Sequence, residues 1–275
     1  MAHTLGLIGG GNMGRALIAA LLSAGKFKPS EVVASDADGE KRAALIADFG
    51  IEATADNAAV LAKAQTVVLA VKPQIISAVL QAVGSRLKAD QLLISVAAGV
   101  TCSSVEQQLP AGARVVRVMP NLPAVAQAGA AALCAGTHAS AADLQHAKEL
   151  FDAVGRTVVV AETQMDAVTG LSGSGPAYVM LVIEGLADGG VQMGLPRDVA
   201  LLLAAQTVYG AARLLLESGE HPGALKDKVA SPGGTTIAGI DALEQSGVRY
   251  AMMNAVKAAT ARARELGKPI SPARS

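Results

Sequence analysis

A short glycine-rich segment near the end of the chain combines residue types that can hold an acid group. Residues 227–239 read DKVASPGGTTIAG, in which Pro232 cannot continue a helix and the two glycines after it allow a sharp bend. Thr235 and Thr236 then open a run of apolar residues at helical spacing. The first N–H groups of a helix attract anions, so the segment is suited to binding a carboxylate. A plain turn with a helix cap is the alternative.

The beginning of the chain carries a second pattern with a defined chemical use. Gly9, Gly11 and Gly14 form GxGxxG between an expected strand, Thr4–Ile8, and an expected helix, Asn12–Ala24. In this setting the glycines allow a tight turn, the close approach of a pyrophosphate and close packing of the helix on the sheet. Because strand–helix units repeat behind it, the pattern predicts a dinucleotide site.

An acidic residue after the second expected strand bears on the identity of that dinucleotide. Asp36 follows the glycines by about 20 residues, where a carboxylate usually binds the ribose 2′-OH of NAD. Ser35, Lys41 and Arg42 lie near it and could instead surround the 2′-phosphate of NADP. Asp36 could also cap the helix that starts near Asp38. The sequence leaves NAD and NADP open.

Three later strands are expected to end beside the predicted dinucleotide site, because the carboxyl ends of strands in such sheets face the ligand crevice. The first ends in Ala70–Pro73 (AVKP), which puts Lys72 where the ribose or nicotinamide would lie, although a solvated surface lysine is the alternative. The next two end in Ala97–Gly99 and Met119–Asn121. Small residues at these ends would let a flat ring approach the backbone.

The elements that must position these residues alternate between strand and helix over residues 1–162. The expected strands are Thr4–Ile8, Val32–Ser35, Thr66–Val71, Leu92–Val96, Arg114–Met119 and Thr157–Val160. Helices are expected at Asn12–Ala24, Glu40–Phe49 and Ala141–Val154. Such alternation indicates an α/β fold with a parallel sheet wound by right-handed crossovers, a Rossmann-type dinucleotide-binding domain.

From about Gln164 the strand pattern stops, so residues 163–275 are expected to form an all-helical second domain. The predicted helices are Asp166–Gly194, Pro196–Ser218, Thr235–Gln245 and Val248–Leu266. The helix at Pro196 is apolar nearly all round, and such a helix must be buried on every side. Four or five helices of one chain rarely enclose it so fully, and we therefore expect a dimer built from these helices.

Composition excludes several other classes of protein. The 275 residues carry no formal net charge, so binding of nucleic acid through phosphate neutralisation is not expected. The long uncharged runs contain glycine, serine and proline, and none is interpreted as a membrane span. Cys102 and Cys134 have no metal-type spacing, so a reducing compartment with neither a disulfide nor a metal is expected. Each is expected to be a small buried residue, and a reactive thiol is the alternative. We expect a cytoplasmic protein.

A string of small residues interrupts the first helix of the second domain. Ser172–Tyr178 reads SGSGPAY, and Gly and Pro inside a helix cost ~1 and ~3 kcal/mol relative to Ala. Such a string is expected only where close packing or a ligand requires it. A kink at a helix crossing is the alternative, and both explanations can hold together.

Taken together, these motifs resemble those of one family, the pyrroline-5-carboxylate reductases. The matching segments follow the expected order over nearly the whole chain: Gly9–Gly14 (GGGNMG), Ala70–Pro73 (AVKP), Met119–Asn121 (MPN), Ser172–Tyr178 (SGSGPAY) and Asp227–Gly239 (DKVASPGGTTIAG). The last two are the most specific. Two positions depart from the family pattern: Leu122 replaces the usual threonine after MPN, and Asp36 stands where many members have a serine-rich turn.

The resemblance implies reduction of 1-pyrroline-5-carboxylate to L-proline by NADPH or NADH, in interlocked dimers that often assemble into decamers. It implies that the partner subunit supplies the site for the substrate carboxylate, which consists of Ser231, Gly233, Gly234, Thr235 and Thr236. Thr236 is also implied to lie near the ring nitrogen. The cofactor residues that the motifs and the resemblance indicate are Gly9, Gly11, Asn12, Met13, Gly14, Ser35, Asp36, Asn57, Val71, Lys72, Pro73, Ala97 and Ala98.

Two competing functions can be weighed from the residues. A 3-hydroxyacid dehydrogenase of similar build would need a base, typically a lysine on the first helix of the second domain, and residues 164–196 contain none. A sensor that kept the fold without catalysis is the other alternative, because fold alone does not establish function. The motifs contain no His, Glu or Cys in a catalytic pairing, and His221 is expected to cap a helix or lie on the surface.

Overall fold

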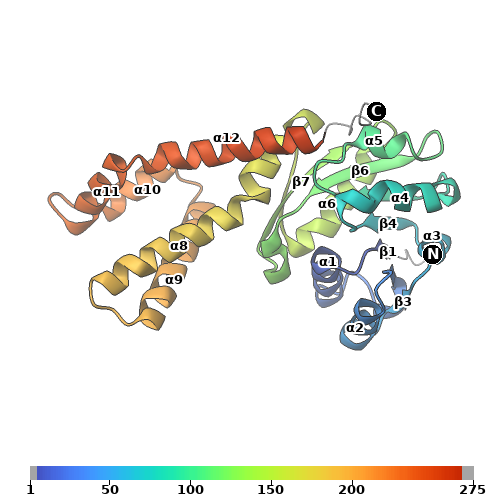
Figure 1. Ribbon diagram of the computed structural model, residues 1–275, viewed down its shortest axis with the longest axis horizontal. Helices are drawn as coiled ribbons and strands as arrows, with labels where there is room; N and C mark the ends of the chain where they lie inside the picture. The colour runs from blue at the N-terminus through green and yellow to red at the C-terminus, as the bar shows by residue number, and fades with distance from the viewer. Residues whose placement is uncertain (1–4, 268–275) are drawn as a thin grey trace, which may run out of the picture. The chain divides into compact units, whose positions relative to one another are not determined.

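The computed structural model describes residues 5–267, which divide into two compact units (Figure 1). Of the described residues, the first unit contains 5–174 and 259–267, and the second contains Gly175–Ala258. The boundary expected after residue 162 therefore falls inside the first unit, because residues 163–174 pack onto it: Met165 is fully buried there. The expected first residue of the first strand, Thr4, lies outside the described residues.

The first unit is built on one eight-stranded sheet in the order β3-β2-β1-β4-β5-β6-β7-β8. The strands are β1 (Leu5–Ile8), β2 (Val32–Ser35), β3 (Glu52–Thr54), β4 (Thr66–Leu69), β5 (Leu92–Ser95), β6 (Arg114–Met119), β7 (Gly129–Ala135) and β8 (Gly155–Val159). β1 pairs in parallel with both β2 and β4, so the strand order reverses next to β1. Ligands of such sheets bind at this reversal, outside the carboxyl ends of the strands.

The expectation of an entirely parallel sheet is wrong at one place, because β6 and β7 are antiparallel. Only residues 120–128 connect these strands, which is too few for the crossover that a parallel pair needs. The sequence did not predict β7, whose GAAALCA is rich in alanine and poor in β-branched residues. It also missed β3, which has three residues.

Helices cover both faces of the sheet, which is why the central strands β1, β2, β4 and β5 are buried along their whole length. One face packs against α1 (Asn12–Ser23), α2 (Gly39–Phe49) and α6 (Ala141–Phe151), and the other against α3 (Asn57–Lys63), α4 (Pro73–Val83) and α5 (Cys102–Glu106). On β1, Leu5 and Leu7 belong to the first core cluster and Ile8 to the second. This alternation follows from the two-residue period of a strand.

The helix expected at Asp166–Gly194 is divided into three parts. A short helix α7 (Met165–Val168) passes into a π-helical turn, η6 (Thr169–Gly173), before α8 (Gly175–Gln192) begins. The π-helical turn ends and α8 begins inside the SGSGP string, where neither Gly nor Pro supports a regular helix interior. The interruption therefore has a structural effect, as the sequence predicts.

The second unit is helical in all of its regular structure within the described residues. It contains α8, α9 (Arg197–Ser218), α10 (Pro222–Val229), α11 (Thr235–Gln245) and most of α12 (Val248–Leu266). The sequence did not predict α10. α8 and α9 pack through small side chains, since Ala187, Ala200 and Ala204 form the buried cluster of this unit. His221 caps α10 by accepting the N–H of Gly223 at its Nδ1 and is exposed, so it has both of the roles that the sequence offered as alternatives.

One chain leaves most of the apolar surface of the second unit exposed. On α9, Leu202 is 69% exposed and Leu216 is 59% exposed. Among the described residues α9 is also the one helix that is long and apolar enough to cross a membrane, with 22 residues, a mean hydropathy of 1.7 and 11% of its apolar window buried. The apolar surface of such a helix must be buried against other residues, and the sequence predicts that a second copy of the chain buries it.

A charge on this exposed face should therefore weaken self-association. Because burying a carboxylate without a partner is costly, we expect Leu202→Glu to raise the dissociation constant between copies by at least about tenfold. Light scattering after gel filtration at several concentrations measures it. Ile46→Glu is the matched control, since Ile46 is an apolar residue of α2 that is 50% exposed in the first unit. Equal masses for the two variants would contradict the assignment of this face.

Candidate active site

The GxGxxG segment forms a tight loop between β1 and α1 whose glycines have different tasks. Gly9 has a φ of +109°, and a Cβ on it would lie 2.7 Å from the carbonyl oxygen of Ala70. A Cβ on Gly14 would collide with the carbonyl of Gly9, so this glycine sets the close packing of α1 on the loop. No described atom lies within 4 Å of a Cβ built on Gly11. The chain's own packing therefore does not require glycine at position 11, whereas a ligand approaching the backbone would.

The N-terminus of α1 is open to an anion. Gly11 is its N-cap residue, and no side chain of the described chain caps the first turn. The N–H groups of that turn have no acceptor inside the helix, and the helix dipole adds positive potential there. These donors and the open space at Gly11 fit the pyrophosphate of a dinucleotide.

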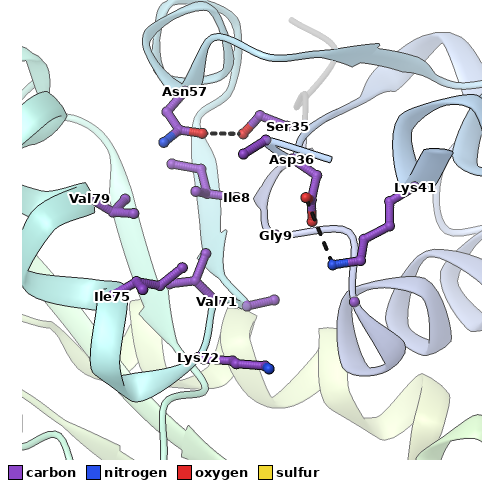
Figure 2. A pocket seen from close by; sticks show the side chains of 13 residues that line it. Ile8, Gly9, Ser35, Asp36, Lys41, Asn57, Val71, Lys72, Ile75 and Val79 are labelled. Atoms are coloured by element: carbon purple, nitrogen blue, oxygen red, sulfur yellow. Dashed lines mark hydrogen bonds and ion pairs between the residues drawn. The ribbon is translucent and has the colours of Figure 1, made fainter. Parts of the chain in front are cut away.

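The carboxylate of Asp36 is bound to the glycine loop itself. Its Oδ2 accepts the N–H of Gly10 at 2.7 Å and its Oδ1 accepts the N–H of Asp38 at 2.9 Å. Lys41 Nζ lies 4.0 Å from Oδ1 (Figure 2). Asp38, rather than Asp36, is the N-cap of α2. Asp36 therefore holds the turn where a cofactor ribose is expected, with a cation beside it.

The two other residues expected near the 2′-position differ in their surroundings. Ser35 is buried and donates its hydroxyl to Oδ1 of Asn57 at 2.7 Å (Figure 2), which fixes the amide of Asn57 at the start of α3. The guanidinium of Arg42 donates to the backbone carbonyls of Asp36 and Ala37 at 2.8 and 2.9 Å. Lys41, not Arg42, is thus the basic residue that lines the groove.

Two adjoining cavities lie along the carboxyl ends of β1, β2 and β4. The first, of about 220 Å³, is lined by Ile8, Gly9, Gly11, Ser35, Asp36, Ala37, Lys41, Asn57, Ala70, Val71, Lys72, Ile75 and Val79 (Figure 2). The second, of about 380 Å³, adds Asn12, Met13, Val96, Met119 and Pro120. They share five residues, including Val71 and Lys72, and so form one continuous groove, which we call the dinucleotide groove.

This groove brings together nine of the thirteen predicted cofactor residues. The other four lie outside its lining: Gly14 packs α1, Pro73 is in the first turn of α4, Ala97 is buried and Ala98 is exposed after β5. Sequence reasoning missed the apolar wall formed by Ile75 and Val79. Their four-residue spacing on α4 was a usable signal for a wall on one helix face.

The Ser172–Tyr178 string also packs closely against the end of β6. A Cβ on Gly173 would lie 2.7 Å from the terminal methyl of Met119. Asn121 donates from Nδ2 to the carbonyl of Ser172 at 3.0 Å and accepts the N–H of Ala130 at its Oδ1. Two of the sequence motifs, MPN and SGSGP, are therefore in direct contact within the first unit. This is the close packing that the sequence predicts for the string.

The glycine–threonine segment of the second unit has the predicted shape. Gly233 has a φ of +66°, and the N–H of Gly234 donates to the carbonyl of Ser231 at 3.0 Å, which closes a turn. α11 then begins at Thr235 with Gly234 as its N-cap residue, and no side chain within residues 5–267 caps it. Thr235 is exposed and Thr236 is half-buried. The first-turn N–H groups and two hydroxyls are thus available to a carboxylate.

The fold and the groove define the class of this protein: an α/β dinucleotide-binding protein with a helical second unit. Comparison with known proteins agrees for both parts. Residues 162–266 match the family model described as "Pyrroline-5-carboxylate reductase dimerisation", and residues 4–99 match that described as "NADP oxidoreductase coenzyme F420-dependent".

Individual relatives match over nearly the whole chain. The chain is 49% identical to pyrroline-5-carboxylate reductase of Methanosarcina acetivorans, over 96% of its own length and 98% of that relative. A solved pyrroline-5-carboxylate reductase of Coxiella burnetii has a TM-score of 0.92 at 36% identity, covering 98% of this chain and 100% of that one. The Plasmodium falciparum enzyme, solved with NADP bound, has a TM-score of 0.86 at 30% identity, with 97% and 98% covered.

The chain belongs to the pyrroline-5-carboxylate reductase family. It is accordingly an NAD(P)H-dependent oxidoreductase whose helical unit mediates oligomerisation. The resemblance that the motifs carry is thereby confirmed, and the 3-hydroxyacid dehydrogenase alternative is set aside.

The place of Asp36 in the groove yields a prediction about cofactor choice. Removing its negative charge should favour a 2′-phosphate, so we expect Asp36→Ser to raise NADPH affinity relative to NADH by about tenfold. The readout is the ratio of the dissociation constants of NADPH and NADH, because loss of the Gly10 contact should weaken the binding of both cofactors equally. Asp38→Ser is the control, since it removes the same charge two residues away and serine still caps α2. An unchanged ratio in Asp36→Ser would show that Asp36 does not act on the 2′-position.

Proposed function

We propose that this protein reduces the C=N bond of 1-pyrroline-5-carboxylate with NADPH to give L-proline, the final step of proline biosynthesis. The observation that carries the proposal is the uncapped start of α11 behind Pro232, Gly233 and Gly234. Membership of the reductase family supplies the identity of the acid that this loop would bind. NADH is the second cofactor that the same groove would accept.

In this proposal the dinucleotide groove binds the cofactor. The pyrophosphate lies against the Gly9–Gly14 loop and the first turn of α1, and the nicotinamide end lies near the ends of β4, β5 and β6. When bound, the cofactor supplies the hydride. The residues assigned to it are Gly9, Gly11, Asn12, Met13, Gly14, Ser35, Asp36, Asn57, Val71, Lys72, Pro73, Ala97 and Ala98, of which nine line the groove.

The substrate's carboxylate is assigned to the start of α11. The N–H groups of its first turn, with Ser231, Gly233 and Gly234 forming the bend before them, would bind the two oxygens. The hydroxyl of Thr235 adds a donor there. Thr236, which is half-buried, would also lie near the ring nitrogen. Binding of its carboxylate would hold the imine in one orientation toward the cofactor.

The reaction needs orientation more than acid–base chemistry. A cyclic imine protonated on nitrogen is already an electrophile, so no strong acid is required to activate it. Positioning two reactants can lower a barrier by about 7–11 kcal/mol at best. Neither the loop at 231–236 nor the described lining of the groove contains His, Cys or Glu, which agrees with such a mechanism.

We assign the complete site to two subunits. The subunits would form a homodimer with intertwined helical domains, in which the 231–236 loop of each subunit serves the dinucleotide groove of its partner. A decamer would be a further assembly of such dimers. The exposed apolar surface of α8 and α9 supports association of this kind, and the match of residues 162–266 to a dimerisation family supports it independently. We also propose a cytoplasmic location and no nucleic-acid or membrane partner.

The direct test follows NADPH absorbance while the protein is incubated with 1-pyrroline-5-carboxylate. We expect oxidation of NADPH with equimolar formation of L-proline, and slower oxidation of NADH under the same conditions. No oxidation above background, in protein that still binds NADPH, would instead support the cofactor-sensing alternative. A rate equal to that with a pyrroline lacking the carboxylate would contradict the role of the α11 loop.

A single substitution separates the substrate loop from the cofactor groove. Because Thr236 lies in the loop and not in the groove, we expect Thr236→Ala to lower kcat by about 10²-fold with NADPH affinity within about twofold of the native value. Thr236→Ser keeps the hydroxyl and should restore most of the rate. A collapse of NADPH binding in Thr236→Ala would show that this division of the site is wrong.

A further inference from the structure

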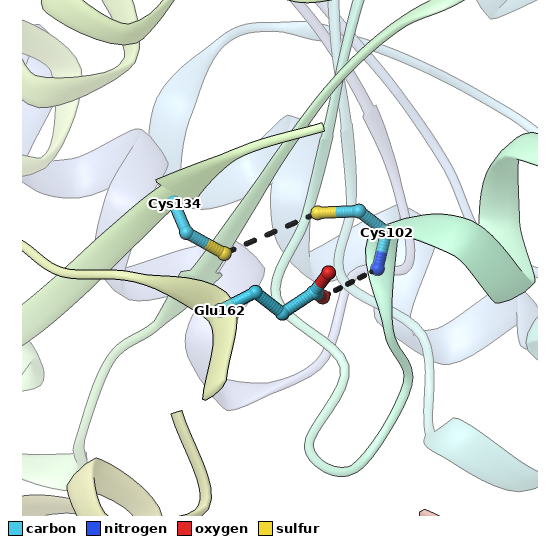
Figure 3. Close-up of side chains that lie close together, drawn as sticks. All are labelled: Cys102, Cys134 and Glu162. Atoms are coloured by element: carbon cyan, nitrogen blue, oxygen red, sulfur yellow. Dashed lines mark hydrogen bonds between the residues drawn. The ribbon is translucent and has the colours of Figure 1, made fainter. Parts of the chain in front are cut away.

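Two thiols that the proposed reaction does not use lie together inside the first unit. Cys102 is the first residue of α5 and Cys134 belongs to β7, and each is 2% exposed. Their Sγ atoms are 4.0 Å apart (Figure 3), in hydrogen-bond contact and not joined by a disulfide. They are separated by 31 residues in sequence, so the fold, and not a local motif, brings them together.

Two charged side chains complete this cluster. Glu162 accepts the backbone N–H of Cys102 at 2.7 Å (Figure 3), and Nη1 of Arg117 lies 3.3 Å from the same carboxylate oxygen. Arg117 is directly opposite Cys134 in the antiparallel β6–β7 pair, so the two side chains point to the same face of the sheet. Arg117 is 3% exposed, and its Nη2 has no hydrogen-bond partner among the residues that the structure describes.

These neighbours make the two thiols chemically unequal. The hydrogen bond from Cys102 lowers the pKa of the Cys134 thiol, and the charge of Arg117 acts in the same direction, although burial and the charge of Glu162 oppose both. The same hydrogen bond, together with burial, raises the pKa of the Cys102 thiol. Cys134 is therefore the thiol that ionises first, beside a buried guanidinium with an open donor, while Cys102 keeps its proton.

We propose that Cys102 and Cys134 are a redox-sensitive pair that hydrogen peroxide converts into a disulfide. The Cys134 thiolate attacks one peroxide oxygen, the O–O bond breaks, and Cys134 becomes a sulfenic acid as hydroxide leaves. The Cys102 sulfur then attacks the Cys134 sulfur, the S–O bond breaks, and water leaves with the Cys102 proton. Two thiols lose two electrons in total, and one peroxide is reduced to two waters.

The same three residues could also be considered as metal ligands. The ligand atoms of Cys102, Cys134 and Glu162 lie within 4.8 Å of one another. One oxygen of Glu162, Oε1, is already engaged by the guanidinium of Arg117 and the N–H of Cys102. A divalent cation at these ligands would lie close to the buried positive charge of Arg117, which disfavours it, whereas a disulfide adds no charge there.

Closing the disulfide should move the segment before α5. An S–S bond of about 2.0 Å requires the sulfurs to approach by about 2 Å. β7 is held by β6 on one side and β8 on the other, whereas the first residue of α5 is held through the bond of its N–H to Glu162, so we expect the start of α5 to be the part that shifts. The chain from Val96, which lines the groove, to Cys102 is a short loop with a φ of +76° at Gly99. Oxidation would therefore weaken NADPH binding, and this consequence rests on the proposed function.

The disulfide itself can be tested without any assay of activity. The native full-length protein is treated with hydrogen peroxide, the excess is removed with catalase, and intact mass and free thiols are measured after denaturation. We expect the loss of two hydrogen atoms and of both thiols, with recovery of both by dithiothreitol. Addition of oxygen atoms without this loss, or two thiols that stay unreacted in the folded protein, would overturn the proposal. Stoichiometric zinc in the purified protein would overturn it in favour of a metal site.

Two conservative variants separate the roles of the thiols. In Cys102→Ser the sulfenic acid formed on Cys134 has no second thiol to react with, so it should persist and form an adduct with dimedone. In Cys134→Ser the remaining Cys102 should react more slowly, because burial and the nearby carboxylate of Glu162 still raise the pKa of its thiol. Equal rates of labelling in the two variants would contradict the assignment of Cys134 as the attacking residue.

The coupling to the cofactor is measured separately on the same samples. We expect the NADPH dissociation constant of the oxidised protein to be at least about fivefold higher than that of the reduced protein, and to return with dithiothreitol. Peroxide-treated Cys102→Ser, which cannot form the disulfide, controls for other oxidation. A disulfide with unchanged NADPH affinity would overturn the coupling, whereas reduced protein that does not bind NADPH would count against the proposed function.

Discussion

The proposed site depends on the backbone N–H groups at the starts of α1 and α11, which no side chain caps within the described residues. α1 and α11 are the two helices with glycine at the described N-cap position, Gly11 and Gly234, and neither start has a side-chain cap. Elsewhere Asp38 and Ser140 cap α2 and α6 with their side chains. An uncapped start loses about 1 kcal/mol of helix stability relative to a good cap, and it keeps its donors available for an anion. We assign the start of α1 to a pyrophosphate and the start of α11 to a carboxylate.

Much of this arrangement could be predicted from the sequence because its signals are local. β2, β6, α11 and α12 have the predicted bounds, since each is a clear periodic or apolar run between turn residues. β7 could not be predicted because its alanines favour no strand, and with it the one antiparallel pair was missed. The bond between Asp36 and Gly10 joins residues 26 positions apart, so no local pattern could show that this carboxylate is engaged by the loop.

A single chain does not bury the apolar surface of its second unit. Its buried cluster consists of Ala187, Ala200 and Ala204, which bring α8 and α9 close together and contribute little apolar area. Large side chains such as Leu202 point away from this cluster and remain exposed. The hydrophobic effect therefore favours association with another copy, and assembly becomes part of folding for this unit. A carboxylate-binding loop on such a unit would be ordered together with the assembly.

The central claim is that the start of α11 holds the substrate's acid group and so directs the imine toward the cofactor. A crystal structure of the protein with NADP and L-proline, the product, tests it most directly. We expect the proline carboxylate within hydrogen-bond distance of the backbone N–H groups of Thr235 and Thr236, with the ring facing the nicotinamide. Proline bound away from residues 231–236 would contradict the claim.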